Sequence, residues 1–378
     1  MKTLLITLEY PPQIGGIASY VFNVAAHLPS EEVVVYAPRM KEDKEFDEKN
    51  GWKVIRKKPE FSFLWPKWLR LLWQVWRIVK RDQIKMIQVH HVLPVGYVAY
   101  AVKKILGVPY TLFFHGTDVE IGTRSWFKRK MVTMVCESAA IIVVNSEFLK
   151  NKLLERVERV EGKIVILNPC PGEQFFQLVQ PERLSSLKSQ LALEGKKVIL
   201  TVARMSEGKG YPRLVRLLPQ ILQRVPNLVW LVIGDGPKKK VVIDLVQKYY
   251  LQNVTRFMGT VPYEELPRYY QLADLFVLLT HPDESAEEGW GTAFLEASAS
   301  GIPVVAGRVG GVEESVQNLV TGLVVDVYQD ESIIAAVSDL LRKEDYAKKM
   351  GEAGRVRAGK EFRWEREVRK INSMRIYE

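Results

Sequence analysis

The sequence predicts an α/β protein built from two doubly wound domains, and three observations indicate this fold. Short apolar runs recur along the 378 residues and alternate with stretches long enough to form helices. The runs are almost continuously apolar, which is typical of parallel strands covered on both faces. A segment rich in proline and glycine, residues 168–176, divides the chain into halves that can each bury a core. We expect domains at residues 1–170 and 171–360, followed by a last helix at 361–378.

Composition narrows the class of protein. The apolar fraction of 47% and the charged fraction of 26% are ordinary for a globular chain. Two cysteines, Cys136 and Cys170, exclude a disulfide framework and lack the spacing of a metal site. Residues 2–8 are too short for a signal peptide, and no run of 18 apolar residues could span a bilayer. We expect a cytoplasmic protein, or one on the inner face of a membrane.

The net charge of +10 predicts an anionic partner, which leaves nucleic acid, a nucleotide sugar and anionic lipid as candidates. Nucleic acid is the weakest of these, because the aromatic residues do not alternate with the basic ones.

The first half begins with a strand, a loop containing Gly15 and Gly16, and an amphipathic helix that ends near residue 28. Two glycines between a strand and a helix let the backbone approach a phosphate, although a plain tight turn has the same pattern. The loop lacks the GxGxxG pattern of dinucleotide-binding enzymes. The expected strands of this half are residues 2–8, 32–37, 52–55, 85–89, 109–114, 140–144 and 164–167.

Polar residues follow several of these strands, where doubly wound sheets bind their ligands. His115 follows one strand and precedes a glycine, and Asn145 and Ser146 follow another. A lone histidine in a loop is usually incidental, but this placement makes His115 a candidate. His90 and His91 have no third ligand at suitable spacing, so we interpret them as structural or as acceptor-side residues.

Residues 61–81 hold four of the nine tryptophans. On a helical wheel, Lys67, Arg70, Gln74, Arg77 and Arg81 share one face, and aromatic and aliphatic residues cover most of the rest. Residues 56–85 contain nine basic and two acidic residues, a net charge of +7. This pattern predicts a helix lying on an anionic membrane, with a core helix packed on the sheet as the alternative.

The second half repeats the alternation, with strands expected at residues 197–203, 228–233, 254–258, 274–279 and 302–306. Arg204 follows the first of these strands and Lys209 precedes the next helix, so both can reach a phosphate. A solvated basic loop is the alternative. Helices are expected around residues 94–106 and 125–137, from about 212, and over 342–360.

Residues 288–301 begin with two glycines that flank Trp290, and a helix is expected from Thr292 to residue 300. Thr292 is the expected N-cap of this helix. Such a helix start offers free N–H groups to an anion. Glu288 and Glu296 are too far apart to flank one glycosidic bond, because eight residues span about 12 Å even in a helix. They are spaced to hold two parts of one long ligand, or they are surface glutamates at a helix start.

One motif consists of Glu288 and Glu296, separated by seven residues, and the following Ser-Ala-Ser-Gly-Ile-Pro-Val-Val. It resembles the signature of glycosyltransferase family 4, whose retaining enzymes have the GT-B fold. The resemblance implies two Rossmann-like domains facing a cleft, with the nucleotide sugar on the second domain and the last helix packed back on the first. It assigns catalytic roles to His115, Arg204, Lys209 and Glu288. It assigns donor binding to Gly15, Gly16, Asn145, Ser146, Gly234, Asp235, Met258, Gly291, Thr292, Ala293 and Glu296.

In that family the first glutamate contacts the transferred sugar, the second the ribose, and the basic pair the diphosphate. The chain departs from the family at residues 168–171, where an Asn-Gly-Val-Asp-like turn is usual, which affects the hinge and not the chemistry. No Asp-x-Asp motif occurs, so we expect no catalytic metal and no cofactor beyond the donor.

We therefore expect a retaining hexosyltransferase using GDP-mannose or UDP-glucose, with a lipid or lipid-linked glycan as acceptor and an anionic membrane bound through about residues 61–81. The alternatives are an epimerase or phosphorylase of the same fold, and a catalytically silent membrane adaptor. The intact set of motif residues argues against the adaptor.

Overall fold

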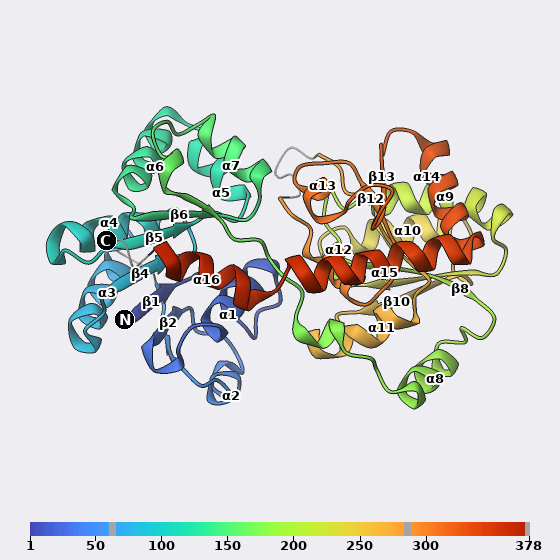
Figure 1. The fold of residues 1–378 in the computed structure, drawn as a ribbon, viewed down its shortest axis with the longest axis horizontal. Helices are drawn as coiled ribbons and strands as arrows, with labels where there is room; N and C mark the ends of the chain where they lie inside the picture. The colour runs from blue at the N-terminus through green and yellow to red at the C-terminus, as the bar shows by residue number, and fades with distance from the viewer. Residues whose placement is uncertain (60–65, 283–288, 375–378) are drawn as a thin grey trace. The chain divides into compact units, whose positions relative to one another are not determined.

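The computed structural model describes residues 1–59, 66–282 and 289–374, and the chain forms two compact units. The N-terminal unit combines Met1–Pro169 with the segment from Trp364, and the C-terminal unit is Cys170–Arg363 (Figure 1). Each unit contains one parallel sheet with helices packed on it, which confirms the predicted fold class.

The sheet of the N-terminal unit has the strand order β3-β2-β1-β4-β5-β6-β7, and all neighbouring strands are parallel. The order reverses between β1 and β4, and ligands of such sheets bind where the carboxyl ends of the two strands separate. The strands are β1 (Thr3–Ile6), β2 (Val33–Ala37), β3 (Lys53–Arg56), β4 (Met86–Val89), β5 (Tyr110–Phe113), β6 (Ile141–Val144) and β7 (Ile164–Ile166).

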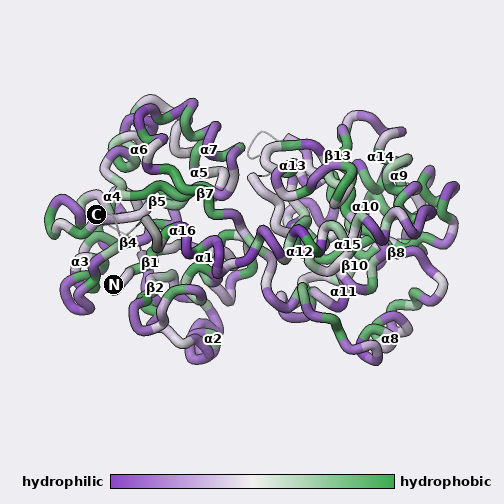
Figure 2. Tube along the Cα trace, viewed as in Figure 1, coloured by the Kyte–Doolittle hydropathy of each residue, from purple (hydrophilic) through white to green (hydrophobic). Residues whose placement is uncertain are grey.

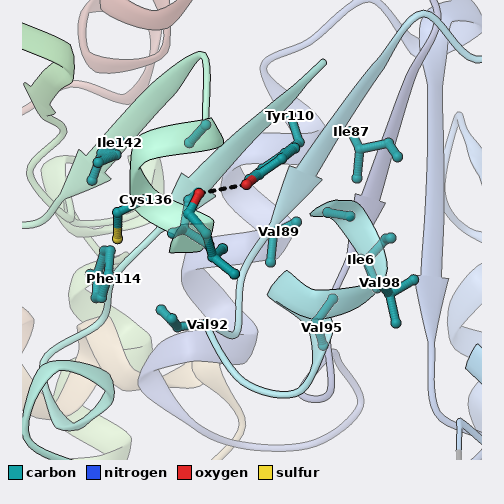
Figure 3. Packing of buried hydrophobic residues seen from close by; sticks show 14 of the residues in the cluster. Ile6, Ile87, Val89, Val92, Val95, Val98, Tyr110, Phe114, Cys136 and Ile142 are labelled. Carbon is teal, nitrogen blue, oxygen red and sulfur yellow. Dashed lines mark hydrogen bonds between the residues drawn. The ribbon is translucent and has the colours of Figure 1, made fainter. Parts of the chain in front are cut away.

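The helices of this unit are α1 (Gly16–Ala26), α2 (Asp43–Glu48), α3 (Leu69–Asp82), α4 (Val95–Leu106), α5 (Thr117–Thr123), α6 (Trp126–Ser138), α7 (Glu147–Leu154) and α16 (Trp364–Met374), with short 3-10 turns η1 (Ser30–Glu32) and η2 (Glu161–Lys163). Buried residues of α3, α4 and α6 form one apolar cluster with the strands. In Figure 3, Val95 and Val98 of α4 lie among buried side chains of the strands, and the Tyr110 hydroxyl donates to the carbonyl of Val135.

Helix α16 packs back on the N-terminal unit, although it lies at the far end of the chain. The Trp364 ring meets Tyr20 of α1 edge-on at 5.3 Å. The Glu367 carboxylate accepts from the amide of Asn168 at 2.8 Å, and the Lys370 ammonium donates to the carbonyl of Ile166 at 3.2 Å. These contacts tie both ends of the chain into one unit.

The sheet of the C-terminal unit has the order β10-β9-β8-β11-β12-β13, again with parallel neighbours, and reverses between β8 and β11. Its strands are β8 (Lys197–Val202), β9 (Leu228–Ile233), β10 (Thr255–Gly259), β11 (Leu275–Leu278), β12 (Val304–Gly307) and β13 (Gly322–Val325). Its helices are α8 (Pro181–Gln190), α9 (Tyr211–Arg224), α10 (Lys239–Lys248), α11 (Leu266–Leu272), α12 (Thr292–Ala299), α13 (Val312–Ser315), α14 (Asp330–Arg342) and α15 (Glu344–Glu361), with 3-10 turns η3 (Glu173–Phe176) and η4 (Tyr263–Glu265). Green apolar segments mark the strands of both sheets in Figure 2.

Helix α3 corrects part of the prediction for residues 61–81. It begins at Leu69, and residues 60–65 of the expected helix lie outside the described residues. Gln74, expected on the polar face, is buried because its amide accepts from the Tyr36 hydroxyl and donates to the carbonyl of Lys58. Trp73, expected on the apolar face, is 53% exposed. The helix is therefore both a core element and an exposed aromatic surface.

Within the described residues, none of the helices has the length and apolar character needed to cross a bilayer.

Candidate functional site

The loops after β8 and β9 are tied together by backbone hydrogen bonds. The amide of Met205 donates to the carbonyl of Asp235, and the amide of Lys238 donates to the carbonyl of Met205, both at 2.9 Å. Gly234 has φ 134°, and a Cβ there would lie 2.0 Å from the carbonyl oxygen of Ala203. Only glycine permits this close approach, so the conformation of both loops depends on it.

The loop after β8 is also joined to the loop after β11, the other strand at the reversal of the sheet. The amide of His281 donates to the carbonyl of Gly208 at 2.9 Å. Gly210 has φ 70°, and a Cβ there would lie 2.0 Å from the carbonyl oxygen of Leu279. The backbone that carries Arg204 and Lys209 is therefore fixed from two sides at the predicted ligand-binding edge.

Arg204 and Lys209 lie on this fixed loop. Arg204 is exposed, and in the described part of the chain no carboxylate forms an ion pair with it. Lys209 is half-buried. The predicted donor residue Asp235 pairs with Lys239 at 2.7 Å, which holds the pKa of its carboxyl below the ordinary value. An exposed guanidinium without a paired acid can bind a phosphate group.

The start of α12 differs from the prediction in its cap. Gly291, with φ 80°, is the N-cap, and Thr292 is the first residue of the helix. A glycine in the left-handed region can turn the chain into the helix at no steric cost, so a threonine cap is not needed. Thr292 and Ala293 are half-buried on the first turn, where N–H groups are free of helical partners. Glu288 lies outside the described residues, and its role stays a prediction.

Glu296 is a buried carboxyl group in the middle of α12, only 7% exposed. The Tyr270 hydroxyl donates to its Oε2 at 2.9 Å, and the Tyr263 hydroxyl is a second hydrogen-bond partner. Burial raises the pKa of Glu296 to about 7, and the two tyrosine hydrogen bonds only partly oppose this. Tyr263 also accepts from the amide of Gly172, so the network reaches the chain segment that enters this unit.

These two tyrosines are functional candidates that the sequence interpretation missed. Tyr263 begins η4 and Tyr270 lies on α11, 33 and 26 residues before Glu296. No spacing rule joins such residues. The only signal in the sequence is the aromatic enrichment of residues 263–270, which a buried helix also explains.

Met258, a predicted donor contact, lies in β10 where the pairing with β9 shifts register. It is half-buried and packs on the apolar cluster of this face of the sheet. The irregular pairing places it at the carboxyl end of β10, next to Gly259, whose carbonyl accepts from the amide of Gly234.

In the N-terminal unit, Gly15 and Gly16 begin α1 directly after the loop that follows β1. Gly15 is the N-cap, with extended backbone, and its carbonyl accepts from the amide of Ser19 at 3.0 Å. A Cβ on Gly16 would meet no atom within 4 Å, so space is left beside the first turn. The free amides of this turn suit an anion, as the sequence predicts.

His115 follows β5 and belongs to an aromatic group. Its ring stacks on His90 at 5.7 Å between centroids and meets Tyr20 edge-on at 5.1 Å. Burial lowers its pKa to about 3, with a smaller contribution from His91. Its amide donates to Asp118, and its Nε2 has no hydrogen-bond partner among the described residues. The imidazole is therefore neutral.

His90 and His91 have different environments. His90 is fully buried and stacks on Phe113 at 4.1 Å, and burial lowers its pKa well below the ordinary value. His91 accepts from the amide of Leu8 at 3.2 Å and lies 3.8 Å from Glu9. In the described part of the chain, no three His, Cys, Asp or Glu side chains are placed to share a metal ion.

Asn145 and Ser146 follow β6 and are both buried. Ser146 is the N-cap of α7: its hydroxyl accepts from the amide of Leu149 at 3.1 Å and donates to the side-chain oxygen of Asn145. The carbonyl of Asn145 accepts from the side chain of Asn168 at 2.9 Å. Both residues shape the loop, and their predicted donor contacts remain predictions.

Two family descriptions match the chain. "Glycosyltransferase Family 4" matches residues 14–170, and "Glycosyl transferases group 1" matches residues 184–357. Together they cover most of both units.

Curated relatives match the chain along nearly its whole length. A GDP-mannose-dependent alpha-(1-6)-phosphatidylinositol monomannoside mannosyltransferase of Mycolicibacterium smegmatis is 28% identical over 375 residues, covering 96% of this chain and 94% of the relative. A GDP-mannose-dependent monoacylated alpha-(1-6)-phosphatidylinositol monomannoside mannosyltransferase of Corynebacterium glutamicum is 26% identical, covering 96% and 95%.

Solved structures share the fold. HepE from Anabaena in complex with UDP superimposes with a TM-score of 0.85 at 18% identity, covering 100% of both chains. Sucrose-phosphate synthase from Thermosynechococcus elongatus has a TM-score of 0.82 at 20% identity, covering 100% of this chain and 98% of that one. Both likenesses concern the arrangement of helices and strands.

Proposed function

Because this chain belongs to glycosyltransferase family 4, we propose that it transfers a hexose from a nucleotide-diphosphate sugar to a hydroxyl group of a lipid or lipid-linked glycan. The observation that carries the proposal is the match to phosphatidylinositol monomannoside mannosyltransferases along 96% of the chain. GDP-mannose is accordingly the first donor to test and UDP-glucose the second.

In the mechanism that we propose, the protein positions the substrates and neutralises the charge of the leaving diphosphate, without a metal ion. Arg204 and Lys209 neutralise the departing diphosphate, with help from the free amides at the start of α12. Glu296 holds the ribose, and Glu288 contacts the sugar. The neutral His115 offers a ring nitrogen to a sugar hydroxyl. The acceptor hydroxyl attacks the anomeric carbon on the face that the leaving group occupied, the bond from that carbon to the diphosphate breaks, and a departing phosphate oxygen takes the hydroxyl proton. The anomeric configuration is thereby retained.

The diphosphate assignment can be tested separately from the identity of the sugar. Arg204→Ala and Lys209→Ala should each lower turnover by roughly 10²-fold, the scale for losing one charge-stabilising donor. Lys248→Ala is the matched control, because Lys248 is an exposed cation on the last turn of α10. Wild-type turnover in both single variants would remove the assignment.

Replacing each of the two glutamates should weaken the binding of different ligands. Glu296→Ala should weaken binding of the free nucleotide diphosphate as well as the donor, whereas Glu288→Ala should weaken chiefly the intact donor. Isothermal calorimetry with GDP and with GDP-mannose distinguishes these patterns. The reverse pattern would contradict both assignments.

We also propose that α3 binds the inner face of an anionic membrane. The proposal rests on Trp73, which is 53% exposed with the Arg77 guanidinium 4.8 Å from its ring, and on the net charge of +7 over residues 56–85. The Lys80 ammonium lies 4.4 Å from the ring of Trp76, so each of these two rings has a cation beside it. Such a surface suits lipid headgroups, where cations meet phosphates and aromatic rings lie at the interface.

The test of the activity has two steps. Thermal-shift measurements with GDP-mannose and UDP-glucose identify the donor, because a ligand present at about 100 times its Kd stabilises the folded state by about 2.7 kcal/mol. The stabilising donor is then incubated with phosphatidylinositol monomannoside in vesicles, and the lipid is analysed by mass spectrometry. A lipid heavier by one hexose supports the proposal. Release of a sugar phosphate in the presence of phosphate, with the lipid unchanged, would favour a phosphorylase.

A further inference from the structure

A second aromatic and basic surface lies at the start of α6, in residues 124–130, which read Arg-Ser-Trp-Phe-Lys-Arg-Lys. Trp126 is 76% exposed and Phe127 64% exposed, and both are the first residues of the helix. The buried side of α6 is formed further along, by Val132, Val135 and Cys136. The two aromatic side chains therefore contribute little to the core that the rest of the helix packs on.

The charges of this surface are not neutralised by the protein. Residues 124–130 contain four basic and no acidic residues, and among the described residues none of the four basic side chains forms an ion pair with a carboxylate. The contacts they do make are to other groups: Arg129 donates to the carbonyl of Arg156 at 2.8 Å, and the Lys130 ammonium lies 5.5 Å from the Trp126 ring. Four cations around two exposed aromatic rings are complementary to an anionic, partly apolar surface.

The distribution of charge along the chain supports the same partner. Residues 56–85 have a net charge of +7 and residues 124–130 a net charge of +4, so the remainder of the chain has a net charge of −1. The positive excess is thus confined to two segments of one unit. An excess serving only solubility would have no reason to gather around exposed tryptophans.

Topology places the two segments in one layer. Helices α3, α4 and α6 share one apolar cluster on one face of the sheet (Figure 1). In a parallel sheet each connecting helix begins at the carboxyl end of one strand and returns to the amino end of the next. The helix starts at Leu69 and Trp126 therefore lie towards the same edge of the layer, where the candidate residue His115 is also found.

We propose that residues 124–130 form a second membrane-binding surface, in which Trp126 and Phe127 enter the interfacial region of a bilayer and the surrounding cations bind anionic headgroups. The partner is an anionic phospholipid membrane, and the proposal rests on the lipid-directed function proposed above. Two contacts on one helical layer fix the orientation of the unit on the membrane, whereas α3 alone would leave it free to rotate about the helix axis.

The experiment measures binding of the full-length protein to vesicles of phosphatidylcholine, with and without phosphatidylglycerol, by flotation. The variants are Trp126→Ser with Phe127→Ser, and Lys128→Ala with Lys130→Ala. The matched control is Tyr250→Ser, because Tyr250 is an equally exposed aromatic residue, 88% exposed, on the other unit. Each basic residue near an anionic surface changes affinity about fivefold, so the lysine variant should bind about tenfold or more weakly.

A depth measurement excludes an indirect effect on folding. Phospholipids brominated on their acyl chains should quench the fluorescence of wild-type protein more than that of Trp126→Phe, because only an inserted indole contacts the quencher. Unchanged thermal unfolding and unchanged calorimetric binding of the donor nucleotide show that the variants are folded.

The results separate this proposal from the proposed function. Wild-type vesicle binding by both double variants would overturn the second surface, even if hexose transfer to lipid proceeds. Binding that falls equally in Tyr250→Ser, or equal binding to neutral and anionic vesicles, would overturn it as well. If instead vesicle binding depends on residues 124–130 but no hexose reaches a lipid, the proposed activity fails while the membrane surface stands.

Discussion

Replacing Glu296 with glutamine should stabilise the protein above neutral pH while weakening nucleotide binding. The pKa of Glu296 rises from an ordinary value of 4.5 to about 7 on folding, because the carboxyl group is buried. At 1.36 kcal/mol per pH unit, this difference corresponds to about 3 kcal/mol.

The sign follows from where the proton is bound. Between pH 4.5 and about 7 the folded state keeps a proton that the unfolded state has released, so stability falls as the pH rises through this window. Above pH 7 the full cost of a buried carboxylate is present. Glutamine does not titrate and can still accept from Tyr270, so the variant avoids this loss.

The assay is thermal or urea unfolding of wild type and Glu296→Gln at pH 5 and pH 8. Because other carboxyl groups titrate in both proteins, the informative quantity is the difference between them, which should grow by about 3 kcal/mol, or roughly 6–12 °C, from pH 5 to pH 8. Tyr270→Phe removes a hydrogen bond that lowers the pKa of Glu296, so its stability should fall more steeply than that of wild type. A difference that is the same at both pH values would refute the burial argument.

Three further outcomes follow from the site. Arg204→Ala should lower turnover by roughly 10²-fold in a donor-consumption assay, whereas Lys248→Ala should not. Gly234→Ala should lower the free energy of unfolding in urea far more than Gly195→Ala. Both glycines have positive φ, which costs an alanine about 1–2 kcal/mol, but only at Gly234 would the new Cβ lie 2.0 Å from a backbone oxygen. The pKa of His115 is lowered to about 3 in the folded protein, so below pH 6.5 the unfolded state binds a proton that the folded state does not, and stability falls. His115→Gln should therefore lessen the loss of stability in acid. An unchanged dependence of stability on pH below 6.5 would contradict this.

The sequence was sufficient for the fold because strands buried on both faces are continuously apolar. Residues 228–233 illustrate this, since all six are buried in β9. Strand β13 (Gly322–Val325) was not predicted, because four residues that begin with glycine at a sheet edge have too little pattern to recognise. The turns were predictable where glycine is required, as at Gly234, but their mutual hydrogen bonds depend on tertiary structure.

The candidate site could be predicted only as a set of positions. The motif identifies Glu296, but its environment comes from Tyr263 and Tyr270, which reach it through the packing of α11 and η4. Burial likewise decides that His115 is neutral, and no local pattern predicts burial of a histidine in a loop. The sequence analysis did not single out residues 124–130, because their pattern also fits an ordinary helix start. The exposure of Trp126 and Phe127 in the structure distinguishes the two interpretations.

Helix α3 shows why a polar residue can mislead a helical wheel. Its buried residues are Leu71, Gln74, Val75, Ile78 and Val79, the spacing of one continuous helix face. Gln74 can occupy that face because the Tyr36 hydroxyl and the Lys58 carbonyl satisfy its amide, which removes the cost of burying it. With the buried face placed there, Trp73 turns outward beside Arg77. The exposed tryptophan is therefore a consequence of how the core is packed: one face of the helix packs on the sheet, and Trp73 on another face stays exposed for the membrane contact that we propose.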